Sequence, residues 1–334
     1  MSIDITVVWA FIIAFAVFAY VVMDGFDLGI GILFNRFPVG HERDTAMNSI
    51  APVWDGNETW LVLGGGGLLA AFPLAYAVVL PALYVPIIAM LLALVFRGVA
   101  FEFRWRDPAH RQAWDIAFQG GSFIAAFMQG VALGALLQGI TVEGRAYAGG
   151  WWEWLSPFSV LTGLSVVAGY ALLGACWLIL KTEGGLQARA RAQAKWLGPV
   201  TLAAIGAVSF VTPFLETAYF DRWLTWPSIL WVAPVPLLVA LSSLLFWRSL
   251  QRGDEGLPFL LTLIIFFLCF TGLGISMWPY IVPESITIWD AATTRSGQIF
   301  MLVGAAITVP LILGYTGWAY WVFRGKVKAD GYHH

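Results

Sequence analysis

The sequence predicts an all-α polytopic membrane protein with nine transmembrane helices, its N-terminus outside the membrane and its C-terminus in the cytoplasm. Two observations predict this fold class. First, 60% of the 334 residues are apolar and only 11% are charged, whereas a soluble domain carries about 25% charged residues. Second, the apolar residues form runs of the length that a spanning helix needs, about 20 residues. The chain has too few charges to cover a surface that faces water, so we expect lipid to cover it.

Nine apolar runs are long enough to span a membrane, and they form one integral membrane domain over residues 1–334. No Lys or Arg precedes the first run, which is longer than the apolar core of a signal peptide, about 7–15 residues, so we expect it to remain as a helix. Pro73 marks a tight turn after the second span, and Pro81 and Pro86 predict kinks in the third. The predicted spans are residues 5–34, 50–73, 76–97, 115–139, 156–180, 196–217, 227–247, 258–282 and 298–323.

The basic residues are distributed unevenly between the two sides of the predicted spans. Of the 18 Lys and Arg residues, 15 lie in the C-terminal tail and in the loops of the same side, and only Arg145, Arg222 and Arg295 lie on the other side. Cytoplasmic loops carry the excess of Lys and Arg, which gives the predicted orientation. The chain has no basic stripe of the kind that binds nucleic acid, so we exclude nucleic acid as a partner.

Four carboxyl groups lie inside the first two predicted spans. Asp24 and Asp27 occur in MDGFDLGIG, and Asp55 and Glu58 occur in IAPVWDGNETWLVL. The i, i+3 spacing within each pair places its two members on one helix face. A central Asp in a span costs at least ~2.5 kcal/mol, so such groups usually face a bundle interior or an aqueous path. Because the two helices are antiparallel, we expect the four groups at a similar depth, in one pocket open to the cytoplasm.

These carboxyl groups suit a proton relay, with Asp55 as its main member. Two other interpretations remain open. The groups can have only a structural role, as helix caps or as partners of arginines such as Arg97 and Arg104, and Asp and Asn oxygens also suit a hard cation. The neighbouring residues that we expect to support the site are Trp54, Asn57 and Trp60.

The histidines and cysteines restrict the cofactors that this chain can hold. A haem between membrane helices needs an axial His, and no histidine lies in a predicted span. The cysteines lie in separate apolar runs and give neither a disulfide framework nor a CxxC metal spacing. We therefore expect this chain to hold no haem and no metal. The residues concerned are His41, His110, His333, His334, Cys176 and Cys269.

Two further stretches have plain structural interpretations. The run Gly64–Gly67 has no Lys-Ser/Thr after it, so we expect close helix packing or local unwinding rather than a phosphate loop. The stretch FRGVAFEFRWR, residues 96–106, predicts arginines that snorkel to the cytoplasmic interface, together with one salt bridge.

At DGFDLGIG, NSIAPVWDGNETWL, FRGVAFEFR and TIWDAATT the chain resembles subunit II of the cytochrome bd-type quinol oxidases, over essentially its whole length. The brief outer loops and the GYH tail resemble the short, cyanide-insensitive branch. The resemblance implies a heterodimer in the bacterial cytoplasmic membrane. Its subunit I carries haems b558, b595 and d, oxidises quinol at its outer face and reduces O2 to water with protons from the cytoplasm, which generates proton motive force.

For this chain, the resemblance implies support of the haem-bearing subunit I, a share in the cytoplasmic proton path and, in some members, a bound quinone. A small third subunit is a further candidate partner, beside membrane lipid. Carried over by motif, Asp55 of WDGN is the proton-path residue, and Asp24 and Asp27 of DGFD are supporting polar groups. The chain alone is not expected to be catalytic.

An alternative function is a secondary transporter that uses Asp24, Asp27 and Asp55 as a cation or proton site. Gly-rich and Pro-interrupted spans fit such a carrier, but the sequence shows no inverted halves. A third hypothesis is a structural membrane partner whose polar groups only fix the packing.

Overall fold

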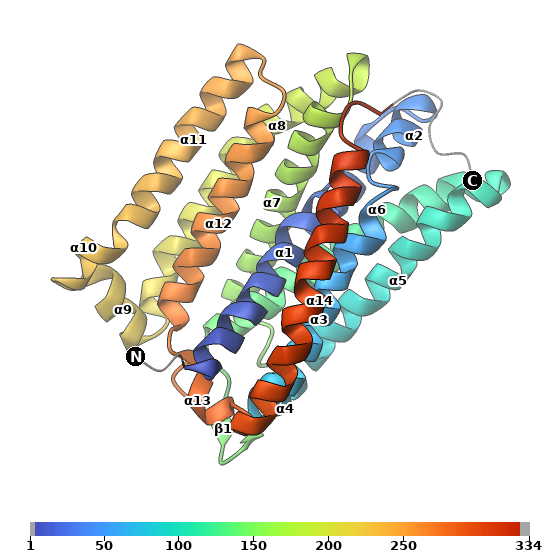
Figure 1. Cartoon of the computed structure of the whole chain (residues 1–334). Coiled ribbons are helices and arrows are strands. Elements are labelled where there is room, and N and C mark those ends of the chain that lie inside the picture. Colours follow the sequence, from blue (N-terminus) through green and yellow to red (C-terminus); the bar gives the residue numbers. More distant parts are fainter. Residues whose placement is uncertain (1–3, 328–334) are drawn as a thin grey trace.

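The computed structural model describes residues 4–327 and is a bundle of long helices with two short β-hairpins at one end (Figure 1). The first helix begins at the hairpin end, and the last helix ends at the opposite end of the bundle. Lys328, His333 and His334 lie outside the described residues.

Fourteen α-helices follow one another along the described chain, and the two hairpins pair β1 with β2 and β3 with β4, both antiparallel. The helices are α1 (Ile5–Leu33), α2 (His41–Asn48), α3 (Trp54–Ala71), α4 (Pro73–Ala82), α5 (Tyr84–Arg106), α6 (Arg111–Leu137), α7 (Pro157–Lys181), α8 (Gly184–Val211), α9 (Thr217–Leu224), α10 (Ser228–Val232), α11 (Pro234–Arg252), α12 (Leu257–Met277), α13 (Ile288–Ala291) and α14 (Arg295–Val322). The strands are β1 (Val142–Glu143), β2 (Ala146–Tyr147), β3 (Tyr280–Val282) and β4 (Ile286–Thr287).

Among the described residues, 8 helical segments are long and apolar enough to cross a membrane. They correspond to eight of the nine predicted spans. The remaining one, α3, has 18 residues but opens with Asp55, Asn57 and Glu58, which lower its mean hydropathy. The count of nine spans and the orientation of the termini therefore stay predictions.

The second and third predicted spans, residues 50–73 and 76–97, differ most from the structure. The chain turns over Ile50–Val53 before α3 begins, and the third span is divided at Leu83 into α4 and α5. Pro86 lies in the first turn of α5, where a missing N–H leaves no helical hydrogen bond unmade. In place of the two expected kinks, the structure has one helix break at Leu83, between Pro81 and Pro86.

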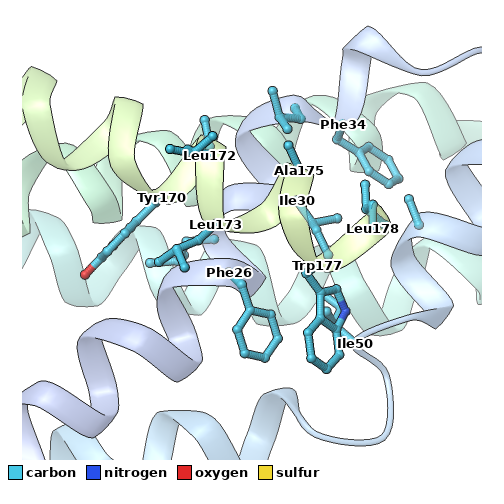
Figure 2. Packing of buried hydrophobic residues seen from close by; sticks show 14 of the residues in the cluster. Phe26, Ile30, Phe34, Ile50, Tyr170, Leu172, Leu173, Ala175, Trp177 and Leu178 are labelled. Atoms are coloured by element: carbon cyan, nitrogen blue, oxygen red, sulfur yellow. The ribbon is translucent and has the colours of Figure 1, made fainter. Parts of the chain in front are cut away.

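The core is built around α1, which packs closely against α7. A Cβ added to Gly29 would lie 1.8 Å from the carbonyl oxygen of Tyr170, and one added to Gly174 would lie 2.5 Å from the carbonyl carbon of Gly29. The two backbones are therefore in contact, as small residues allow between membrane helices. Figure 2 shows the side chains around this contact, where the rings of Phe26 and Trp177 stack with centroids 4.2 Å apart.

The four consecutive glycines do not unwind α3, which is helical throughout. Local unwinding is therefore wrong for this run. Close packing is confirmed at two positions, because a Cβ at Gly64 would lie 3.4 Å from Val17 and one at Gly67 would lie 3.2 Å from Ile13. Both contacts are with α1.

Candidate proton site

Arg97 lies at the centre of a buried cluster of charges. Its Nη1 is 2.6 Å from Glu58 Oε1 and 3.2 Å from Asp24 Oδ1, and its Nη2 is 4.0 Å from Asp27 Oδ2. Arg97, Asp24 and Asp27 are fully buried, whereas the side chain of Glu58 is 30% exposed. We call these four residues the Arg97 cluster. It sets three carboxyl groups against one guanidinium.

Three helices position the cluster. Helix α1 presents Asp24 and Asp27 one turn apart, α3 presents Glu58, and α5 presents Arg97. A Cβ added to Gly121 on α6 would lie 2.7 Å from the carbonyl oxygen of Ala93 and 3.0 Å from the amide nitrogen of Arg97. The backbone of α6 therefore packs directly against α5 at the residue that carries the guanidinium.

Asn57 connects the cluster to α14. Its Nδ2 donates to Asp27 Oδ2 at 2.7 Å and to the carbonyl oxygen of Met23 at 3.3 Å. Its Oδ1 accepts a hydrogen bond from the hydroxyl of Tyr320 at 2.9 Å. All three polar positions of the amide are used, so its orientation is fixed.

A second set of polar side chains lies beside Asp24. Tyr20 precedes Asp24 by one helical turn, and its hydroxyl accepts a hydrogen bond from Gln129 Nε2 at 2.8 Å. Gln129 Oε1 in turn accepts from the hydroxyl of Tyr170 at 2.7 Å. Polar groups thus extend from α1 through α6 to α7.

Several buried atoms of the cluster form no hydrogen bond within the described residues. They include both carboxyl oxygens of Asp24 and one of Asp27, Oδ1. Buried polar atoms are nearly always paired, so these oxygens stand out. Arg97 is the cation that faces them, with its Nη1 3.2 Å from Asp24 Oδ1 and its Nη2 4.0 Å from Asp27 Oδ2.

Asp55 does not join the other three carboxyl groups. It is exposed near the start of α3, and its side chain forms no hydrogen bond or ion pair within residues 4–327. Arg97 and Glu102 act on it through their charges only. The structure thus brings together Asp24, Asp27 and Glu58 but leaves Asp55 at the surface of the chain.

The predicted supporting aromatic residues have different surroundings. Trp54 stacks on Phe101 with ring centroids 5.0 Å apart, and its ring lies 5.7 Å from the Arg97 guanidinium carbon. Trp60 is buried and packs edge to face against Phe15, with centroids 5.6 Å apart. Trp54 therefore borders the cluster, whereas Trp60 contributes to the packing of α3 on α1.

The arginines of residues 96–106 are not all at the interface. Arg97 and Arg104 are buried, so the prediction that they snorkel is wrong. The predicted salt bridge within this stretch is the exposed pair of Arg106 and Glu102, at 3.9 Å. Sequence reasoning named Arg97 as a salt-bridge partner but missed its central place. Arg97 is the last residue of the predicted span 76–97, so its place in the sequence gave no signal of its burial. Tyr320 and Gln129 gave none.

A second network of ion pairs lies at the C-terminal end of α5, about two turns beyond Arg97. Asp115 Oδ2 is 2.6 Å from Arg43 Nη1, and Asp115 Oδ1 is 2.5 Å from Arg104 Nε. Arg104 Nη1 is also 2.9 Å from Asp44 Oδ1, which binds Arg111 as well. These pairs join α2, α5 and α6, so we assign them a structural role.

The described residues give no internal imidazole for a haem. His41 and His110 are both exposed, and His110 hydrogen-bonds Asp107 on the surface. No group of three His, Cys, Asp or Glu side chains within residues 4–327 could hold a metal ion. Cys176 and Cys269 are free thiols.

Comparisons with known proteins identify relatives over nearly the whole chain. Residues 5–323 match the family model of cytochrome bd terminal oxidase subunit II. The chain is 31% identical to cytochrome bd-I ubiquinol oxidase subunit 2 of Escherichia coli, with 97% of this chain and 95% of that one covered. It is 30% identical to cytochrome bd ubiquinol oxidase subunit 2 of Bacillus subtilis, with 96% of each chain covered. Its fold matches a chain of the bd oxidase from Geobacillus thermodenitrificans with a TM-score of 0.82 at 19% identity, over 96% of this chain and 99% of that one.

Proposed function

Because the chain belongs to the family of cytochrome bd terminal oxidase subunit II, we propose that the Arg97 cluster is part of the path by which cytoplasmic protons reach the site of O2 reduction. The chain is a subunit of a quinol oxidase and a multi-pass protein of the bacterial inner membrane. Its family implies a subunit I as partner. We do not retain the transporter alternative, because the family is one of oxidases.

One observation carries the proposal: three carboxyl groups surround a single buried cation. If all three were ionised, Arg97 would leave two negative charges uncompensated in a site where Asp24 and Asp27 are fully buried. An unpaired charge in a low-dielectric interior is very unfavourable. The cluster is therefore expected to hold at least one proton, and a proton held by competing carboxyl groups can be passed on.

The exposure of the carboxyl groups gives the path a direction. Asp55 is exposed, Glu58 is partly exposed, and Asp24 and Asp27 are fully buried. We propose that Asp55 receives protons at the cytoplasmic mouth and passes them to Glu58, which exchanges them with the buried pair across Arg97. The cytoplasmic placement of this mouth follows from the predicted orientation, which the excess of Lys and Arg supports.

The partner supplies the redox chemistry. We propose that subunit I holds haems b558, b595 and d, since the described part of this chain presents only exposed histidines. Ubiquinol, which the name of the Escherichia coli relative specifies, is the proposed electron donor. If its protons leave on the outer side while the protons for water come from inside, the reaction is electrogenic without a pump.

Neutralising single carboxyl groups in the assembled oxidase tests the proposal. Asp27→Asn, Glu58→Gln and Asp55→Asn should each lower quinol oxidase turnover while the haem content stays normal. Glu143→Gln, which changes an exposed carboxyl group on β1 at the hairpin end, is the matched control and should have no effect.

The two other outcomes separate the rival interpretations. Full turnover of all three variants with normal haem content would show that the carboxyl groups have only a structural role. A parallel loss of turnover and haem would instead indicate a role in assembly.

A further inference from the structure

Helix α14 is attached to the rest of the described chain by few contacts. Gln298 is its only buried residue. At the outer end, the carbonyl oxygen of Gln298 accepts from Trp9 Nε1 at 3.1 Å, and Thr293, just before the helix, donates to the carbonyl oxygen of Ala71 at 2.9 Å. The inner end is held by polar contacts as well.

Two lysines hold this inner end by reciprocal capping. Lys181 Nζ, at the end of α7, donates to the carbonyl oxygen of Phe323, at the end of α14. Lys326 Nζ, just beyond α14, donates to the carbonyl oxygen of Thr182 at 3.0 Å and forms an ion pair with Glu255 at 2.7 Å. Cations are favourable at helix C-termini, so each lysine stabilises the end of the other helix.

Tyr320 lies one turn before this lysine contact and points to the Arg97 cluster. Its hydroxyl donates to Asn57 Oδ1 at 2.9 Å. Its ring packs edge to face on Trp177, with centroids 6.1 Å apart, and Trp177 stacks on Phe26, the residue before Asp27. Both the ring and the hydroxyl of Tyr320 are thus fixed.

The hydroxyl of Tyr320 is the contact that holds the oxygen end of the Asn57 amide away from Asp27. With Oδ1 bound to this donor, Nδ2 points to Asp27 Oδ2 at 2.7 Å. A reversed amide would place two oxygens against each other and remove that bond. Loss of the tyrosine hydroxyl would remove one of the three contacts that oppose this rotation and leave only the two bonds of Nδ2, to Asp27 and to the carbonyl oxygen of Met23.

We infer that Tyr320 is a positioning residue for Asp27: α14, held by Lys181 and Lys326, orients the Asn57 amide and so fixes the hydrogen bond to the buried carboxyl group. This inference rests on the proposed function of the Arg97 cluster and extends that site to the last helix.

The test uses Tyr320→Phe, Asn57→Ala and the double variant in the assembled oxidase. Tyr320→Phe should lower turnover about fivefold, the factor expected for one hydrogen bond, with normal haem content. Because Tyr320 acts through Asn57, it should have no further effect in the Asn57→Ala background. Tyr315→Phe is the matched control, since Tyr315 lies on the same helix, is 71% exposed and should not matter.

Reduced-minus-oxidised infrared spectra give a readout that a purely structural role would not change. The carboxyl C=O band that is absent from Asp27→Asn should shift to higher frequency in Tyr320→Phe and stay in place in Tyr315→Phe. Additive effects of Tyr320→Phe and Asn57→Ala, or unchanged turnover with an unmoved band, would overturn the inference. Full turnover of Asp27→Asn together with a shifted band in Tyr320→Phe would refute the proton path but leave the positioning role intact.

Discussion

Arg97 is the residue on which the charge balance of the interior depends. It is the only cation in contact with Asp24, Asp27 and Glu58 within the described chain. Removing one partner of a buried ion pair typically costs about 3–5 kcal/mol, because the remaining charge is left uncompensated. The effect of a substitution should therefore depend strongly on whether it removes the cation or one of the carboxyl groups.

Arg97→Met should destabilise the assembled oxidase by about 3–5 kcal/mol, since it leaves three carboxyl groups without a cation. Thermal inactivation and haem retention measure this loss. Arg106→Met is the control, because the Arg106 side chain is 71% exposed and its pair with Glu102 is a surface contact worth at most about 1 kcal/mol. Equal stability of the two variants would show that Arg97 does not balance the buried charges.

A second prediction concerns the loops at the hairpin end. Burial and the neighbouring carboxyl group of Glu284 raise the pKa of Glu216 from 4.5 to about 7. The folded protein therefore binds this proton more tightly than the unfolded chain, so its stabilising effect is present at low pH and is lost as the pH rises to about 7. We therefore expect the melting temperature to decrease as the pH is raised from about 5 to about 7.

Glu216→Gln should flatten this dependence, because the neutral amide has no proton to lose. Asp221→Asn, which alters an acidic residue of α9, the helix that Glu216 directly precedes, should retain it. If both variants follow the wild-type curve, a different group causes the dependence.

Helices α1 and α7 approach each other so closely that their contact requires glycine. A Cβ at Gly29 would meet the backbone of Tyr170, which cannot move aside as a flexible side chain could. The opposite case is Gly66 on α3, where an added Cβ would have nothing within 4 Å. The two positions therefore give a matched pair of substitutions.

Gly29→Ala should separate α1 from α7 and destabilise the protein by about 1–3 kcal/mol or more, since overpacked interiors typically lose this much. Gly66→Ala should be neutral or slightly stabilising, because Ala favours a helix over Gly by about 0.5–1 kcal/mol. The yield and the melting temperature of the assembled oxidase check both. A normal yield of Gly29→Ala would mean that the two backbones are not in contact.

The long apolar segments could be predicted from the sequence because hydrophobicity alone determines them. Their ends could not, since α8 begins at Gly184 rather than 196 and continues through the polar residues of the loop. The i, i+3 spacing correctly placed Asp24 and Asp27 on one side of α1. It could not show that Asp55 faces outward, because spacing does not tell which face of a helix is buried. Tyr320 was not predictable, since only the fold brings α14 to Asn57.

For the whole molecule, the division of labour between two subunits is the main expectation. The family assignment makes the chain part of a quinol oxidase, and both described histidines, His41 and His110, are exposed. Under the proposed function, the proton path and the haems belong to different chains, which meet in the membrane.

His41→Ala and His110→Ala should leave the haem b and haem d bands of the purified complex unchanged, because neither side chain lies inside the bundle. A reduced-minus-oxidised spectrum of each variant measures this directly. Loss of a haem band in either variant, with subunit I present, would place an axial ligand in this chain.

The most direct test of the proton path is the voltage that develops across liposomes when the reduced, reconstituted oxidase reacts once with O2. In Asp27→Asn we expect the fast electron-transfer phase to remain and the slower, proton-coupled phase to slow by about tenfold or more, as when a proton-transfer group is removed. A proton-coupled phase of normal rate and amplitude, with normal haem content, would contradict the assignment of the Arg97 cluster to the proton path.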